Sequence, residues 1–167
     1  TNNGTIPGDV GVDYNVVIGE GAMGGSETLS NATMNIAIGY GAFESATTGD
    51  MNVIIGHYSG RSMTTGEKNI SIGRETFQSS EAGVSNIAIG HQALQTVNHT
   101  SNDGSIAIGE LALSAKNLSS GSQFDGATIA IGYKALTDLT SGTGNTAIGY
   151  EAMTENTTGH SNTVIGF

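Results

Sequence analysis

Four histidines are the side chains in this 167-residue sequence best suited to bind a metal ion or transfer a proton, namely His57, His91, His99 and His160. His57 and His91 each follow a glycine directly, and Arg74 follows the equivalent glycine between them. If these positions lie on successive turns of a repeating structure, the two imidazoles are about 10 Å apart, at ~4.8 Å for each turn. A single metal ion cannot bridge that distance, so we expect solvated surface histidines, no metal site and no cofactor. Copies of one histidine from several chains could share a metal only if this column faced inward.

The carboxylates are scattered rather than paired. Asp103-Gly104 and Asp125-Gly126 lie in stretches that we expect to be loops, where such dipeptides are typical of tight turns. The sequence contains neither an Asp-x-Asp-x-Asp-Gly calcium loop nor a Gly-Gly-x-Gly-x-Asp repeat. The Gly-x-Gly within 19–25 is not followed by a helical pattern, which argues against a phosphate loop. We therefore expect no enzyme, and the alternative is a carboxylate pair for glycoside hydrolysis formed between turns or chains.

The composition excludes several classes of partner. The sequence has 5 Lys and Arg against 15 Asp and Glu, a formal net charge of −10 at pH 7, so it repels the phosphates of nucleic acids. It has no Cys, which leaves no disulfide and no thiolate metal site. It has no run of 18 apolar residues, so we expect no membrane insertion.

An internal repeat indicates which elements position these residues. Nine copies of a five-residue unit, most often Asn-apolar-small-Ile-Gly, each end at a glycine that we call the anchor glycine. The anchor glycines are Gly19, Gly39, Gly56, Gly73, Gly90, Gly109, Gly132, Gly149 and Gly166. The interval between successive anchor glycines is most often 17, and it is longer only after Gly19, Gly90 and Gly109. That base period is too short for a repeat that contains a helix, and the longer intervals mark insertions.

Each five-residue unit alternates in a way that predicts a short strand. The residues three and one before the anchor glycine, such as Ile70 and Ile72, share one face, which we expect to close the interior of a coil. The residue between them is usually Ala and points the other way. Because a strand that is apolar on both faces is normally buried on both, we expect other chains to cover this Ala face. A monomeric solenoid with Ala tolerated outside is the alternative.

Three further columns accompany the unit. The Asn four before the anchor glycine is predicted to form a ladder of amide hydrogen bonds along the rod, or else simply to cap a tight turn. Three and four residues after the anchor glycine, the sequence usually has a small residue and then a large one, as in Ala42-Phe43. Another glycine often lies seven residues before the anchor glycine, as Gly49 and Gly66 do. We expect this second glycine to adopt positive φ in a tight turn.

These patterns predict an all-β fold, a repetitive parallel β-solenoid of the β-roll or β-helix kind with about nine 17-residue turns. We expect a lead-in segment over 1–14 and a repeat domain over 15–167. The Ala face further leads us to expect that the domain assembles with other chains.

The pattern NIAIG…A[LMF]…TTG…N resembles the repeats of trimeric phage tail fibres and of bacterial trimeric adhesin heads, over residues 15–167. In adhesin heads a similar [SN]-x-A-I-G unit builds a trimeric left-handed parallel β-roll, from a repeat that is usually shorter than the one in this chain. The resemblance implies a homotrimer, either of intertwined chains or of solenoids packed side by side, in a virion tail fibre or on an extracellular cell surface. It also implies other fibre segments and a host cell-surface glycan or protein receptor as partners.

Recognition on a solenoid usually involves an exposed column or loops that interrupt the period. The residue after the anchor glycine is often aromatic, which suits sugars, although such rings also cover the edge of a turn. The insertions over 95–104 and 114–125 are candidate receptor loops or simply tolerated expansions. The candidate binding residues are Tyr40, His57, Arg74, His91, His99, Asn117, Phe124, Tyr133 and Tyr150.

The sequence therefore predicts a structural and attachment segment of a trimeric surface fibre that binds without catalysis. One alternative is a polysaccharide-degrading tailspike fragment, which requires clustered carboxylates. Another is an ice-binding monomeric β-solenoid, which requires a flat Thr-x-Thr ladder. The Thr pairs at 47–48, 64–65 and 157–158 fall instead in expected tight turns.

Overall fold

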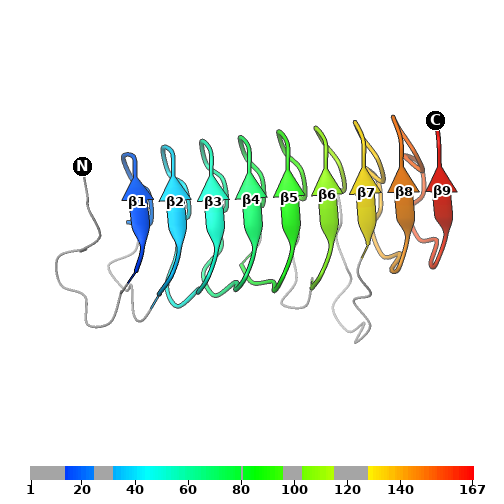
Figure 1. Ribbon diagram of the computed structural model, residues 1–167. Helices are drawn as coiled ribbons and strands as arrows, with labels where there is room; N and C mark the ends of the chain where they lie inside the picture. The colour runs from blue at the N-terminus through cyan, green and yellow to red at the C-terminus, as the bar shows by residue number, and fades with distance from the viewer. Residues whose placement is uncertain (1–13, 25–31, 80, 96–102, 115–127) are drawn as a thin grey trace.

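The computed structural model describes residues 14–24, 32–79, 81–95, 103–114 and 128–167. These residues form one sheet of nine parallel strands, whose order in space follows their order in the chain (Figure 1). The strands are β1 Val16–Ile18, β2 Ile36–Ile38, β3 Val53–Ile55, β4 Ile70–Ile72, β5 Ile87–Ile89, β6 Ile106–Ile108, β7 Ile129–Ile131, β8 Thr146–Ile148 and β9 Thr163–Ile165. No helix in the described parts of the chain is long and apolar enough to cross a membrane.

The strands are stacked turns of a parallel β-solenoid with about seven turns of roughly 17 residues. The predicted all-β solenoid is therefore confirmed. The expectation of about nine turns is not confirmed.

Strand register is kept across insertions as well as across the base period. Ile70 pairs with Ile87 over one base period, and Ile106 pairs with Ile129 over the longest interval in the chain. Each strand ends at an anchor glycine, where the backbone turns with strongly positive φ. At Gly73, φ is 139° and an added Cβ would lie 2.6 Å from the carbonyl oxygen of Gly90 on the next turn. Both the conformation and the close approach of two backbones require glycine there.

The middle residue of each strand, not its neighbours, faces the interior. Ala37, Ala88 and Ala107 are completely buried, whereas the first and third residues of β2–β8 are only half-buried. The expectation that isoleucine fills the interior and alanine faces outward is therefore wrong. The physical reason is space, because the large residue four after the anchor glycine already occupies the narrow interior and leaves room for a small side chain on the strand.

These large residues are the core of the solenoid. Phe43, Phe77, Leu94, Leu113 and Leu136 are fully buried. All have positive φ, between 51° and 56°. Non-glycine residues seldom adopt this conformation, so backbone preferences alone would not predict large apolar residues at these positions. Burial of each large side chain offsets the local strain of its backbone.

The predicted asparagine ladder is present within the described residues. Nδ2 of Asn52 donates to Oδ1 of Asn35 at 3.0 Å, and the backbone N–H of Asn52 donates to the same oxygen at 2.9 Å. Nδ2 also donates to the carbonyl oxygen of Gly66 at 2.8 Å, so each amide caps a tight turn as well. Ser105 and Thr128 replace Asn on two consecutive turns, and the buried Oγ1 of Thr128 has no hydrogen-bond partner.

The glycines seven before the anchor have a different role from the predicted one. Gly49 and Gly66 are absent from the positive-φ positions among the described residues. Instead, an added Cβ at Gly49 would lie 2.6 Å from the carbonyl oxygen of Gly66, and one at Gly66 would lie 2.8 Å from Sδ of Met63. Glycine is needed at these positions for close packing rather than for a left-handed backbone.

Candidate functional site

The outer face of the sheet is a broad apolar surface. It consists of the first and third residues of β1–β9, nearly all Ile or Val, and we call it the isoleucine face. Its members on the inner strands are half-buried, and those on the terminal strands are exposed, with Ile18 at 57%. Only Thr146 and Thr163 interrupt it. The sequence analysis missed this surface because it placed the same residues inside.

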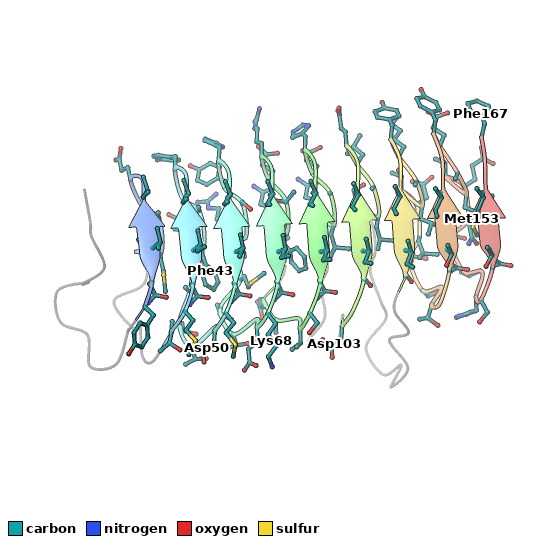
Figure 2. All side chains as sticks on the ribbon, in the orientation of Figure 1. Phe43, Asp50, Lys68, Asp103, Met153 and Phe167 are labelled. Carbon is teal, nitrogen blue, oxygen red and sulfur yellow. The ribbon has the colours of Figure 1, made fainter. Side chains whose placement is uncertain are left out.

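Two columns border the isoleucine face at opposite ends of the strands. The aromatic column, beyond the carboxyl ends, consists of Glu20, Tyr40, His57, Arg74, His91, Glu110, Tyr133, Tyr150 and Phe167. The methionine column, before the amino ends, consists of Tyr14, Met34, Met51, Lys68, Ser85, Gly104, Gly144 and Ser161 among the described residues. Figure 2 labels Phe167 beyond the arrowhead of its strand and Lys68 at the opposite end of another.

A cluster of rings lies in the aromatic column beside β2 and β3. The ring centroids of Tyr40 and His57 are 5.5 Å apart and nearly parallel, while Tyr58 meets both edge-on, 4.3 Å from His57. The Arg61 guanidinium lies 4.4 Å from the Tyr58 ring centroid and pairs with Glu44 at 2.7 Å. The sequence analysis missed Tyr58 and Arg61 because they lie outside the single column that it followed.

A second group of rings follows β7–β9. Tyr133 and Tyr150 stack with centroids 5.2 Å apart, and Tyr150 and Phe167 stack at 5.7 Å. Nζ of Lys134 lies 5.3 Å from the Tyr133 ring centroid. Because the rings stack on one another along the rod, ring edges and hydroxyls face solvent more than ring faces do. A sugar would meet these rims, and a free ring face only at the end of the stack.

Between the two groups of rings lies a polar band. Glu75 accepts hydrogen bonds from Gln92 at 2.9 Å and from Arg74 at 2.8 Å, and His91 lies 3.7 Å from Glu110. The hydrogen bond from Gln92, and then that from Arg74, lower the pKa of the Glu75 carboxyl. In the described portion of the chain, no three His, Cys, Asp or Glu side chains are grouped so that they could hold a metal ion.

The predicted binding residues thus form three groups along one column rather than one site. Tyr40 and His57 belong to the first, Arg74 and His91 to the polar band, and Tyr133 and Tyr150 to the stack. His99, Asn117 and Phe124 lie outside the described residues, as does most of both insertions.

Threonine hydroxyls in the tight turns form hydrogen bonds to the neighbouring turn. Oγ1 of Thr47 donates to the carbonyl oxygen of Thr64 at 3.0 Å, and Oγ1 of Thr140 donates to that of Thr157 at 2.9 Å. The hydrogens of these hydroxyls are therefore bound by the backbone of the next turn.

Comparisons with protein-family models, with curated proteins and with solved structures found no match. The repeat and the surfaces described above are therefore the observations that bear on function.

Proposed function

We propose that this chain is a rod-like segment of a homotrimeric surface fibre, in which three parallel solenoids pack their isoleucine faces around a common axis. The isoleucine face is the observation that carries this proposal. The apolar face is contiguous over nine strands, and contiguous exposed apolar surface commonly marks a contact with another protein. Other chains would thus cover the isoleucine face, rather than the alanine column that the sequence analysis assigned to them.

The strand pairing favours solenoids side by side over an interleaved triple β-helix. Each of β2–β8 pairs on both sides with a strand of its own chain, in unbroken register. An interleaved assembly would have to replace these pairings with pairings between chains. Packing three faces together instead leaves every backbone hydrogen bond of the single chain in place.

For attachment, the surface that we favour is the stack of Tyr133, Tyr150 and Phe167. In a trimer, the methionine column of the next chain lies beside it, and at that height the column offers Gly144 and Ser161. These small residues leave the ring rims accessible. We infer that the stack binds a host cell-surface glycan or receptor without catalysis, on a virion tail fibre or a bacterial surface, with affinity raised by three copies acting together.

A matched pair of variants tests the assembly. Ile89 lies in the middle of the isoleucine face on β5, and Ser79 is an exposed residue outside it. We expect Ile89→Glu to lower the native mass to that of one chain, because three carboxylates would be buried together near the axis. Ser79→Glu should keep the trimer, and both variants should retain the β-sheet circular dichroism of the parent. An Ile89→Glu variant with the parent's native mass would contradict the proposal.

A second pair tests attachment. The parent, Tyr150→Ala and Glu110→Ala proteins are applied to an array of bacterial surface polysaccharides and to whole bacterial cells. We expect Tyr150→Ala to weaken binding by at least tenfold and Glu110→Ala, in the same column, to leave it unchanged. Equal binding by all three proteins would show that the stack is not part of the binding site. No binding by the parent would count against the attachment role.

A further inference from the structure

We propose that Met34 and Met51 of one chain pack against Tyr40, His57 and Tyr58 of the next, and that this contact sets the axial register of the assembly. The inference rests on the proposed trimer and goes beyond it. It assigns the first group of rings to contacts between chains, whereas the stack near β7–β9 stays available for a ligand.

The isoleucine face alone cannot define a register. Its residues recur on every turn, so sliding one chain along another by one strand spacing, about 4.8 Å, restores nearly all of its apolar contacts. Repetitive strand surfaces are prone to such slippage. A defined trimer therefore needs a feature that differs from turn to turn, and the bordering columns supply it.

The methionine column changes character along the rod. Tyr14, Met34 and Met51 are 83%, 53% and 44% exposed, and their φ angles are 66°, 58° and 58°. Further along, Gly104 and Gly144 occupy the same position, where glycine avoids the strain of this conformation. Lys68, Ser85 and Ser161 share this positive φ, so the conformation belongs to the repeat, and the first three turns differ in carrying exposed apolar side chains there. Burial against another chain would remove these side chains from water.

Symmetry identifies the surface that these residues would meet. A rotation about an axis parallel to the rod brings the methionine column of one chain beside the aromatic column of the next, with equivalent turns at the same height. Met34 and Tyr40 lie at the two ends of β2, and Met51 and His57 lie at the two ends of β3. Each methionine would therefore meet a ring of its own turn, and thioethers pack favourably against aromatic rings.

A second copy of this chain is the occupant that the surface favours. Met34 is two residues before Ile36 and Met51 is two before Val53, so both exposed apolar residues lie at the edge of the isoleucine face. The chain that covers that face would also present its own rings at the matching height. An unrelated partner would have to satisfy both conditions independently.

Cysteine pairs test the contact, because the sequence has no cysteine of its own. We would combine Met34→Cys with Tyr40→Cys and oxidise the protein mildly. Within one chain the two positions lie beyond opposite ends of β2, whose three residues alone span about 10 Å, too far for a disulfide. The expected result is a covalent trimer on a non-reducing gel. The matched control combines Met34→Cys with His57→Cys, which is displaced by one turn and should cross-link at least fivefold less.

Three results would overturn the inference. A trimer by native mass that does not cross-link through Met34→Cys with Tyr40→Cys, or through the second in-register pair Met51→Cys with His57→Cys, refutes the contact and leaves the proposed function standing. Preferential cross-linking of the displaced pair assigns a different register. A monomeric parent refutes both proposals. The reduced variants should match the parent in circular dichroism and native mass, which separates lost contact from lost folding.

Discussion

Ile54 packs against Gly60 inside the solenoid: an added Cβ at Gly60 would lie 3.1 Å from Cγ2 of Ile54. In other turns the strand contributes a small residue, as at Ala37, and the position equivalent to Gly60 carries a large one, as at Phe43. In the turn of β3 the strand contributes the large residue, Ile54, and the other position carries the small one, Gly60. The interior therefore holds one large side chain from either of two positions on a turn.

This exchange predicts strong coupling between the two sites. Ile54→Ala alone should lower the free energy of unfolding by about 2–5 kcal/mol because it leaves a cavity. Gly60→Leu alone should lower it by about 1–3 kcal/mol because it overfills the same space. The double variant recreates the usual arrangement and should recover most of the loss. Thermal or urea unfolding at one protein concentration measures this, and additive losses would show that the two residues do not share one space.

The asparagine ladder predicts a stabilising substitution at Thr128. By analogy with the hydrogen bond from Asn52 to Gly66, an amide at this position would donate to the carbonyl oxygen of Gly142 and accept from the backbone N–H of Asn145. It would also remove a buried hydroxyl that lacks a partner. Thr128→Asn should therefore raise the free energy of unfolding by about 1–2 kcal/mol.

Thr128→Val is the control for the ladder, because it removes the unpartnered hydroxyl without supplying an amide. We expect Thr128→Asn to have a higher melting temperature than Thr128→Val at equal protein concentration. If valine stabilises as much as asparagine does, the gain comes only from the lost hydroxyl and the ladder does not extend through this turn.

The lowered pKa of the Glu75 carboxyl predicts that the stability of the protein depends on pH. Its pKa in the folded protein is lowered from 4.5, first by the hydrogen bond from Gln92 and then by that from Arg74. A lowered pKa means that the carboxylate stabilises the fold above the unfolded value, and that this contribution is lost as the pH falls through the folded pKa. Unfolding measured from pH 7 to pH 2 should therefore show a smaller acid loss for Glu75→Gln than for the parent. Parallel curves for the two proteins would assign the acid sensitivity to other groups.

Gln92→Leu separates the two causes of the lowered pKa. It removes the hydrogen bond from the amide and leaves Arg74 in place. The pKa of Glu75, followed by carboxyl NMR, should rise toward its ordinary value without reaching it. No change would leave Arg74 as the sole cause.

The repeat made the architecture predictable, because a short Ile-rich unit that ends at glycine and recurs about every 17 residues favours stacked parallel strands and leaves no room for a helix. The asparagine column was predictable for the same reason. The direction in which each strand faces was not. Alternation assigns Ile72 and Ser71 to opposite faces, but only the space left beside large residues such as Phe77 decides which face is inside.

The surface was predictable in part. The column after the anchor glycine was expected on the surface, and Tyr40 and Tyr150 are exposed there. The stacking of Tyr150 on its neighbours was not expected, because it depends on the side chains of equivalent turns lying about one strand spacing apart. The exposed Met34 and Met51 gave no periodic signal, because their column changes residue type along the rod.

The native mass of the unmodified protein, measured by light scattering after size exclusion, tests the central claim most directly. Three times the 16.9 kDa chain mass is the predicted result, because three isoleucine faces would then be covered at once. A single chain mass at micromolar concentration would contradict the account. It would mean that a nine-stranded apolar face remains in water, and that the chain is a solitary solenoid whose function lies elsewhere.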